Sequence, residues 1–239
     1  MIHIPELHKF SRWLTRKILS RFEKPKVEGQ PEGPPADAPV LGRYWEEAFG
    51  KPLNETRIPE KGDFNQPVEY YAKMYNAAVS LYDNSPSKGD GSLLYGCQVH
   101  AEWGMIYAGA AAVPYALEML KSPVPEARES GASILATVGR EESVIDALLA
   151  AFEEEYEGNA AGDAEKENVQ ALDSMIEALG KMKNRKAIPA LAKVVRNSAM
   201  DNDSRWLAMQ NLGRLVRRRF DKGTDPMDAA IQWLDGHGF

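Results

Sequence analysis

Two nine-residue stretches of this chain repeat one pattern. Ala112–Leu120 reads AVPYALEML, and Ala187–Val195 reads AIPALAKVV. Each begins with Ala, a β-branched residue and Pro, and continues with apolar residues at helical spacing. Proline is tolerated in the first turn of a helix, because its missing N–H leaves no hydrogen bond unmade there. Related segments begin at Ser143 (SVIDALLAAF) and at Asp225 (DPMDAAIQWL), so one type of helix recurs along the chain.

Glycines mark the ends of four apolar helical stretches. They are Gly109, Gly139, Gly180 and Gly213, with spacings of 30, 41 and 33 residues. A helix end often places one residue in the left-handed region, where glycine carries no Cβ penalty. A period in this range predicts a stack of helix pairs, in which each pair buries an apolar face that it cannot bury alone.

The repeating unit of helix, loop, helix and glycine resembles a HEAT repeat of the short bacterial type, known as PBS-lyase HEAT-like. The resemblance is carried by Ala112–Pro114, Ala187–Pro189, Ala178–Gly180 and Asn211–Gly213, and it covers about residues 93–239. It implies an all-α fold, a right-handed α-solenoid of about four helical hairpins. Arrays of this kind serve mostly as scaffolds, so the resemblance implies a protein-binding role and no chemistry.

Composition divides the chain into three parts. Residues 1–24 predict a basic amphipathic arm, residues 25–66 a Pro- and Gly-rich linker and irregular segment, and residues 67–239 the helical repeat domain. A short helix is expected near Tyr44–Phe49. Loops are expected at DNSPSKGDGS (83–92) and at EEEYEGNAAGDAEKEN (153–168), the latter an acidic insertion that projects from the repeats.

The net charge of −6 conceals two oppositely charged segments. Residues 141–167 hold ten Asp or Glu against one Lys, and residues 181–222 hold twelve Lys or Arg against three Asp. The sequence therefore predicts two partner-binding patches. The basic patch comprises Lys186, Arg214, Arg217 and Arg218, with the three arginines on one helical face. The acidic patch lies in the insertion loop and comprises Glu153, Glu154, Glu155 and Glu157.

Another protein is the expected partner, bound through the concave surface of the repeats. Nucleic acid is the alternative, since the basic half is suited to phosphate and Trp206 and Trp233 offer rings for stacking. HEAT-like alkylpurine DNA glycosylases share the length and helical array, but their catalytic acid residue has no counterpart here. Both tryptophans occupy apolar helical positions, which favours places in the core.

No constellation in the sequence predicts an enzyme, a cofactor or a metal centre. Cys97 and His100 lie on one helical face, but zinc normally takes four such ligands, so a buried cysteine and a helix-surface histidine are expected instead. HEAT-like deoxyhypusine hydroxylases bind iron through His-Glu dipeptides, and no such dipeptide occurs. Phosphate-binding loops of the Walker type are also missing.

The expected location is the cytoplasm. No apolar run approaches the roughly 18 residues that span a bilayer, and the first residues lack the apolar core of a signal peptide. The single Cys97 rules out an internal disulfide framework. The basic arm at residues 1–24 leaves three possibilities open: binding at a membrane surface, packing on the repeats or on a partner, and disorder.

Overall fold

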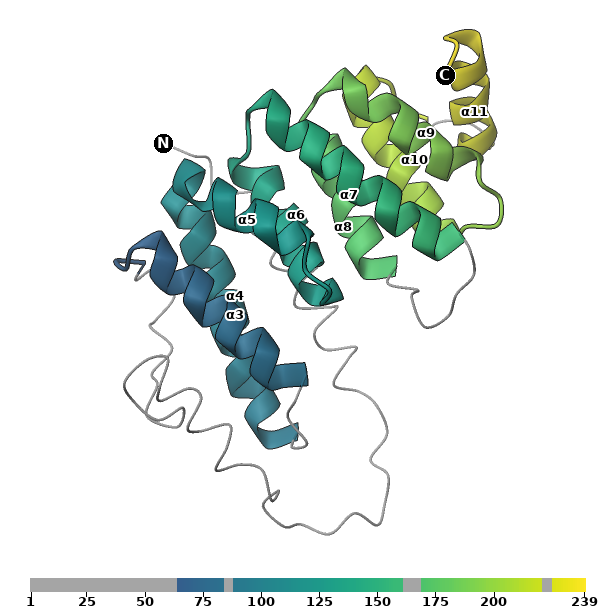
Figure 1. Ribbon diagram of the computed structural model, residues 1–239. Coiled ribbons are helices and arrows are strands. Elements are labelled where there is room, and N and C mark those ends of the chain that lie inside the picture. Colours follow the sequence, from purple (N-terminus) through teal and green to yellow (C-terminus); the bar gives the residue numbers. More distant parts are fainter. Residues whose placement is uncertain (1–63, 84–87, 161–168, 221–224) are drawn as a thin grey trace, which may run out of the picture. The chain divides into compact units, whose positions relative to one another are not determined.

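The structure is a computed structural model, and it describes residues 64–83, 88–160, 169–220 and 225–239. Every regular element in these ranges is a helix (Figure 1), so the all-α prediction is confirmed for the described part of the chain. The predicted arm at 1–24, the linker up to residue 63 and the short helix near Tyr44–Phe49 lie outside the described residues. Residues 161–168 of the acidic insertion lie outside them as well.

The helices pack on one another mainly in sequence order. Their bounds are α3 Val68–Asp83, α4 Lys88–Ala108, α5 Val113–Leu120, α6 Pro125–Val138, α7 Glu142–Ala160, α8 Val169–Lys181, α9 Ile188–Arg196, α10 Asn202–Val216 and α11 Pro226–Gly236, with 3-10 turns η2 Gly109–Ala112 before α5 and η3 Arg185–Ala187 before α9. Helix α3 packs on α4, α5 on α6, α7 on α8 and α9 on α10, and α11 contacts both α9 and α10.

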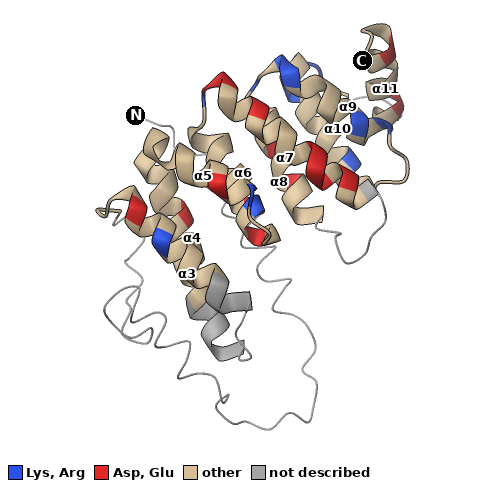
Figure 2. Ribbon diagram, viewed as in Figure 1, with Lys and Arg blue, Asp and Glu red and all other residues tan. Residues whose placement is uncertain are grey.

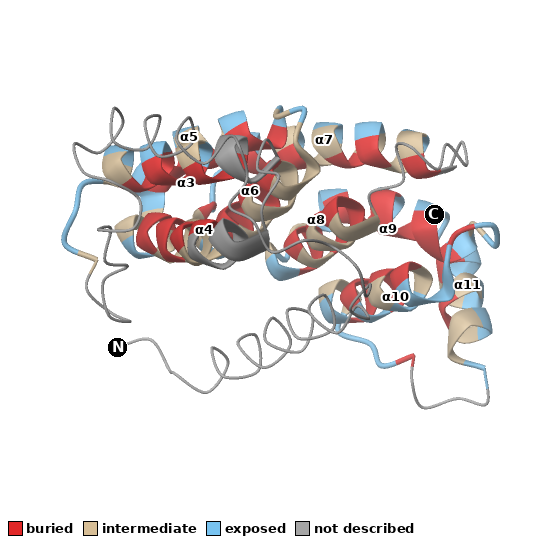
Figure 3. Ribbon diagram, turned by 90° about the horizontal axis from the view of Figure 1, so that it is seen from below, coloured by how far each residue is buried: buried red, intermediate tan, exposed pale blue. Residues whose placement is uncertain are grey.

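Contacts also join successive pairs. Helix α4 contacts α6, α6 contacts α8, and α8 contacts α10, while α5 contacts α7 and α7 contacts α9. Figure 3 shows the buried residues on the sides of the helices that face their neighbours and the exposed residues on the outer sides. In α8 the buried side chains recur at steps of three and four, at Leu172, Met175, Ile176 and Leu179. This spacing gives α8 one apolar face, which packing against other helices buries.

The prolines of the repeated pattern lie where the sequence predicts them. Pro114 occupies the first turn of α5, and Pro189 occupies the first turn of α9. Pro125 and Pro226 begin α6 and α11 in the same way. Four helices in the described residues therefore have proline in their first turn, where its fixed φ suits the helix.

Three of the four glycines play a different role from the one predicted. Gly109 follows α4 with φ +65°, as expected, but Gly139 ends α6 in an extended conformation with φ −72°. Gly180 and Gly213 lie inside α8 and α10. Each of these two helices continues for at least one further residue beyond its glycine. The left-handed positions near the two helix ends are filled by Lys183 (φ 54°) and Arg217 (φ 55°).

The predicted loop at residues 83–92 is wrong at residue 83 and over residues 88–92, which are helical. Helix α4 begins at Lys88, so GDGS (89–92) lies within its first five residues. Before α3, Phe64 stacks on His100 with ring centroids 5.1 Å apart, and the N–H of Gln66 donates to the Tyr71 hydroxyl at 3.1 Å.

Candidate functional site

A pocket of about 460 Å³ lies at the C-terminal end of α10. It is lined by Met209, Gln210, Gly213, Arg214, Arg217, Arg218, Arg219 and Phe220. All four arginines are exposed, whereas Met209 and Phe220 are buried. The pocket thus combines guanidinium groups open to solvent with an apolar floor.

The turn that ends α10 brings these arginines together. Arg217 adopts the left-handed conformation, and the N–H of Arg218 then donates to the carbonyl of Gly213 at 2.9 Å. A hydrogen bond from an N–H to the carbonyl five residues earlier, across a left-handed residue, is characteristic of a Schellman motif. A Cβ on Gly213 would lie 2.6 Å from the Arg218 carbonyl oxygen, so only glycine lets the chain fold back this closely. The segment Arg218–Phe220 therefore returns alongside the last turn of α10.

Two further contacts position the arginine side chains. Arg214 donates to the side-chain oxygen of Asn211 at 2.9 Å, and Asn211 is fully buried against Gly180 of α8. The guanidinium of Arg218 lies over the Phe220 ring, 5.8 Å from its centroid. A cation over an aromatic face is attracted by the ring's quadrupole. Both cations are thereby held by groups that belong to the folded core.

The structure does not bring Lys186 into this pocket. Its ammonium pairs with Glu142 at 2.7 Å and with Asp146 at 2.9 Å, both on α7. These two hydrogen-bonded carboxylates raise the pKa of Lys186. Figure 2 shows the acidic residues along α7 beside basic residues near α9. The predicted basic patch thus separates into a lysine engaged within the protein and three arginines at the pocket.

The four glutamates of the predicted acidic patch lie on a helix, which corrects the prediction of a loop. Helix α7 continues to Ala160, because Phe152, Tyr156 and Asn159 lie on the same face at helical spacing and pack inward. Glutamate itself favours a helix. The helical spacing of these inward-facing residues was the available sign of a helix. The prediction of a loop followed instead from treating the acidic segment as an insertion between helices of the repeats.

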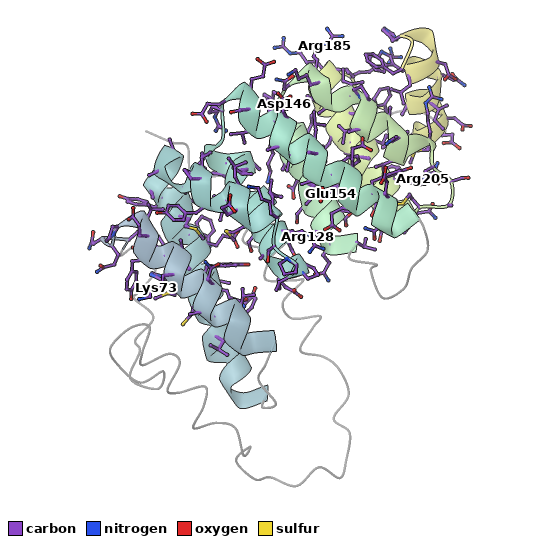
Figure 4. The ribbon with its side chains drawn as sticks, viewed as in Figure 1. Lys73, Arg128, Asp146, Glu154, Arg185 and Arg205 are labelled. Carbon is purple, nitrogen blue, oxygen red and sulfur yellow. The ribbon has the colours of Figure 1, made fainter. Side chains whose placement is uncertain are left out.

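The glutamates also differ in their surroundings. Glu153 pairs with Lys193 of α9, and Glu155 is buried and pairs with Arg128 of α6. Glu154 and Glu157 are exposed. Figure 4 places Asp146 and Glu154 on α7 and Arg128 at the start of α6. Of the four, Glu154 and Glu157 alone combine exposure with no ion pair to another described residue.

Of the two tryptophans predicted to lie in the core, one packs against it. Trp233 is partly buried and stacks on His237, with ring centroids 4.2 Å apart. Trp206 is 40% exposed, so its prediction as a core residue is wrong. Arg205, one residue earlier, donates to the carbonyl of Val195 at 3.1 Å and helps to close the end of α9. Since helix positions four apart share a face, Trp206, Gln210 and Arg214 form one exposed line on α10.

The pocket contains residues that the sequence alone did not single out. Arg219, Gln210, Met209 and Phe220 join Arg214, Arg217 and Arg218 as lining residues. The prediction assumed that the three arginines share a helical face, but α10 ends at Val216. The convergence comes from the turn, and the available signal was the run RRRF directly after the helix.

Cys97 and His100 are both buried, so the expected surface histidine is wrong. His100 lies among aromatic rings, with Phe64 stacked on it and the Tyr71 ring at 5.7 Å in an edge contact. Burial raises the pKa of the Cys97 thiol to about 11. Among the residues that the structure describes, no three His, Cys, Asp or Glu side chains cluster as metal ligands.

A second polar cluster joins α3, α4 and α6. The hydroxyl of Ser130 donates to Glu102 at 3.3 Å, and the Tyr75 hydroxyl lies 2.9 Å from the same Ser130 oxygen. Desolvation raises the pKa of Glu102 to about 7, although hydrogen bonds from Ser133 and Ser130 favour its charged form. The spacing of Glu102 from Cys97 and His100 gave no sign of this cluster.

Comparison of the sequence with models of protein families and with curated proteins finds no match. None of the helices in the described ranges has the length and apolar character needed to cross a membrane. The function is therefore inferred from the geometry of the pocket and from the charges around it.

Proposed function

We propose that this protein is a non-catalytic scaffold that binds another protein through its charged surface. We further propose that its helices form a right-handed α-solenoid of about four HEAT-like hairpins. The successive pairs α3–α4, α5–α6, α7–α8 and α9–α10 support that architecture, as do the contacts between adjacent pairs.

The observation that carries this proposal is the division of basic residues in the C-terminal half. Lys186, Lys193 and Arg196 pair with carboxylates of α7 and α11. All of these side chains are exposed, but Arg214, Arg217 and Arg218 make no ion pair with an acidic side chain in the described ranges. Internal pairing contributes to the fold, whereas exposed and positioned arginines offer charge to a partner.

Binding at such a surface loses little conformational entropy, because the arginines lie at the end of a packed helix. Complementary charge mainly raises the association rate and fixes orientation, so the affinity should fall as salt screens the charges. Exposed Glu154 and Glu157 give α7 the opposite charge. A partner with one acidic and one basic region is accordingly the best match.

The test is affinity capture of the full-length protein from its native lysate, with nuclease-treated and untreated halves at low and moderate salt. The proposal predicts a protein partner that survives nuclease and weakens at the higher salt. Substitution of Arg217→Gly together with Arg218→Gln should reduce its recovery. Arg185→Gln is the control, since Arg185 is an exposed arginine of η3 outside the pocket. If neither half retains a protein above background, the proposal is overturned.

Nucleic-acid binding is the second candidate, and exposed Trp206 on the same line of α10 as Arg214 is the observation that favours it. Base stacking on a tryptophan beside arginines is typical of single-strand binding. Loss of every captured partner after nuclease treatment would favour this function. A random single-stranded oligonucleotide should then bind, and Trp206→Ala should weaken that binding.

A further inference from the structure

We propose that the pocket at the end of α10 binds the phosphate group of a phosphorylated side chain on the partner protein. This inference rests on the proposed function, because it specifies the chemistry by which the partner is recognised. The site is formed by Arg214, Arg217 and Arg218 above the buried side chains of Met209 and Phe220.

The charge of the pocket matches a phosphate monoester better than a single carboxylate. Arg214, Arg217 and Arg218 carry three positive charges, and among the described residues that line the pocket none is acidic. A phosphate monoester carries a charge of about −1.5 to −2 at neutral pH and has three strong acceptor oxygens. A guanidinium group can donate two parallel hydrogen bonds to two of these oxygens. This bidentate geometry makes arginine clusters a common means of phosphate recognition.

The pocket is also preorganised. The Schellman turn fixes the backbone of Arg217 and Arg218, and Asn211 holds Arg214 through a 2.9 Å hydrogen bond. Asn211 is itself fixed, because it is fully buried and donates to the carbonyl of Leu207 at 2.9 Å. Side chains that are already positioned lose less entropy when they bind a ligand.

The floor and size of the pocket fit an organic stem below the phosphate. Phe220 and Met209 are buried beneath the arginines, and Phe220 packs edge-on against Trp233 with ring centroids 6.2 Å apart. The volume of about 460 Å³ exceeds the needs of a lone phosphate ion, so it accommodates a side chain together with its phosphate.

The distribution of charge around the pocket favours a compact anion over a nucleic-acid strand. A strand tracks along successive cations that neutralise several phosphates. Lys186, Lys193 and Arg196, which would extend such a track, are already paired with acidic residues. Arg214, Arg217 and Arg218, in contrast, make no ion pair in the described ranges, and they lie together at the end of α10.

The experiment presents full-length protein with peptide libraries of one design. One library carries phosphoserine, phosphothreonine or phosphotyrosine at a fixed central position, with randomised flanking residues. The matched libraries carry the unmodified residues or glutamate at that position, and a random single-stranded oligonucleotide serves as the nucleic-acid probe. We expect the phosphorylated library to be retained over both matched libraries by roughly tenfold or more.

Variants then test the site. Arg217→Gly with Arg218→Gln should abolish the preference, while Arg185→Gln should leave it unchanged. Arg214→Lys with Arg218→Lys keeps the charge but removes the guanidinium fork, so retention should fall without reaching zero. Thermal unfolding of each variant establishes that it is folded, and Arg217→Gly suits the left-handed backbone at that position.

Equal retention of the glutamate or unmodified library would overturn the inference, as would a preference that survives the arginine substitutions. Preferential retention of the oligonucleotide would replace it with nucleic-acid binding. Repeating the lysate capture after phosphatase treatment separates the two proposals. A protein partner that persists after phosphatase leaves the scaffold function standing and removes the phosphate inference, whereas a lysate that yields no protein partner overturns the scaffold function itself.

Discussion

The side-chain oxygen of Asn211 accepts a hydrogen bond from Arg214 at 2.9 Å. The same amide group lies directly over Gly180 of the adjacent helix, at a place that a Cβ would occupy. One buried contact between α8 and α10 therefore positions a surface cation at the pocket. Packing in the core and charge at the surface are linked through a single side chain.

Gly180→Ala should destabilise the protein and weaken binding at the pocket. The added methyl group overlaps the Asn211 amide, and overpacking of this kind costs about 1–3 kcal/mol of unfolding free energy. Urea denaturation measures the loss. Gly158→Ala is the matched control, since nothing lies within 4 Å of its Cβ and it sits in a helix, so it should stabilise by about 0.5–1 kcal/mol. Equal effects of both substitutions would contradict the packing argument.

Arg217→Gly should move stability and binding in opposite directions. Glycine suits the φ of 55° at this position, so the free energy of unfolding should rise by about 0.5–1 kcal/mol. Loss of the guanidinium should weaken phosphopeptide binding. Lys183→Gly is the control, because Lys183 has a φ of 54° at the end of α8 and lies outside the pocket. It should stabilise similarly and leave binding intact, and a parallel loss of binding would count against the site.

Arg128→Met should be strongly destabilising. It leaves the buried carboxylate of Glu155 without its cation, and removing one partner of a buried pair costs about 3–5 kcal/mol. The double variant Arg128→Met, Glu155→Gln should recover part of that loss. Lys121→Ala is the control, because Lys121 and Glu118 are 70% and 73% exposed and such pairs contribute about 0–1 kcal/mol. Thermal unfolding of all three variants compares them directly.

Stability should fall as the pH rises from about 5 to 8, owing to Glu102. Its pKa is about 7 in the folded protein against an ordinary value of 4.5, so the folded state binds more protons in this window. Once the pH is above the folded pKa, Glu102 is deprotonated in both states, and the stability that its bound proton contributed is lost. Glu102→Gln keeps an acceptor for Ser130 and should unfold with a shallower pH dependence, and at pH 8 it should be more stable by about 1–3 kcal/mol. An unchanged slope between these pH values would contradict the raised pKa of Glu102.

The order of helices was predictable because it depends on local patterns. Proline in the first turn marked the starts of α5 and α9, and apolar residues at helical spacing marked the buried faces. Glycine was a poorer guide to helix ends. Gly180 and Gly213 satisfy close approaches to Asn211 and to the Arg218 carbonyl, and such contacts depend on tertiary packing that a local pattern does not contain.

The pocket was predictable only in part. The run of arginines in GRLVRRRF identified Arg214, Arg217 and Arg218, although a continuous helical face was the wrong reason for their convergence. Lys186 was grouped with them because it shares their charge. Its partners Glu142 and Asp146 lie 44 and 40 residues earlier in the sequence. Pairing between residues so far apart in the chain depends on the tertiary contact of α7 with η3, which no local pattern predicts.

The ion pairs between α7 and the segment that follows α8 bear on the choice of truncated fragments. Glu142 and Asp146 hold Lys186, and Glu153 holds Lys193. A fragment that stops before residue 185 would lose both lysines and leave these three carboxylates without counterions. It would display a more acidic α7 than the intact protein does, and it would attract basic molecules that the full chain leaves alone.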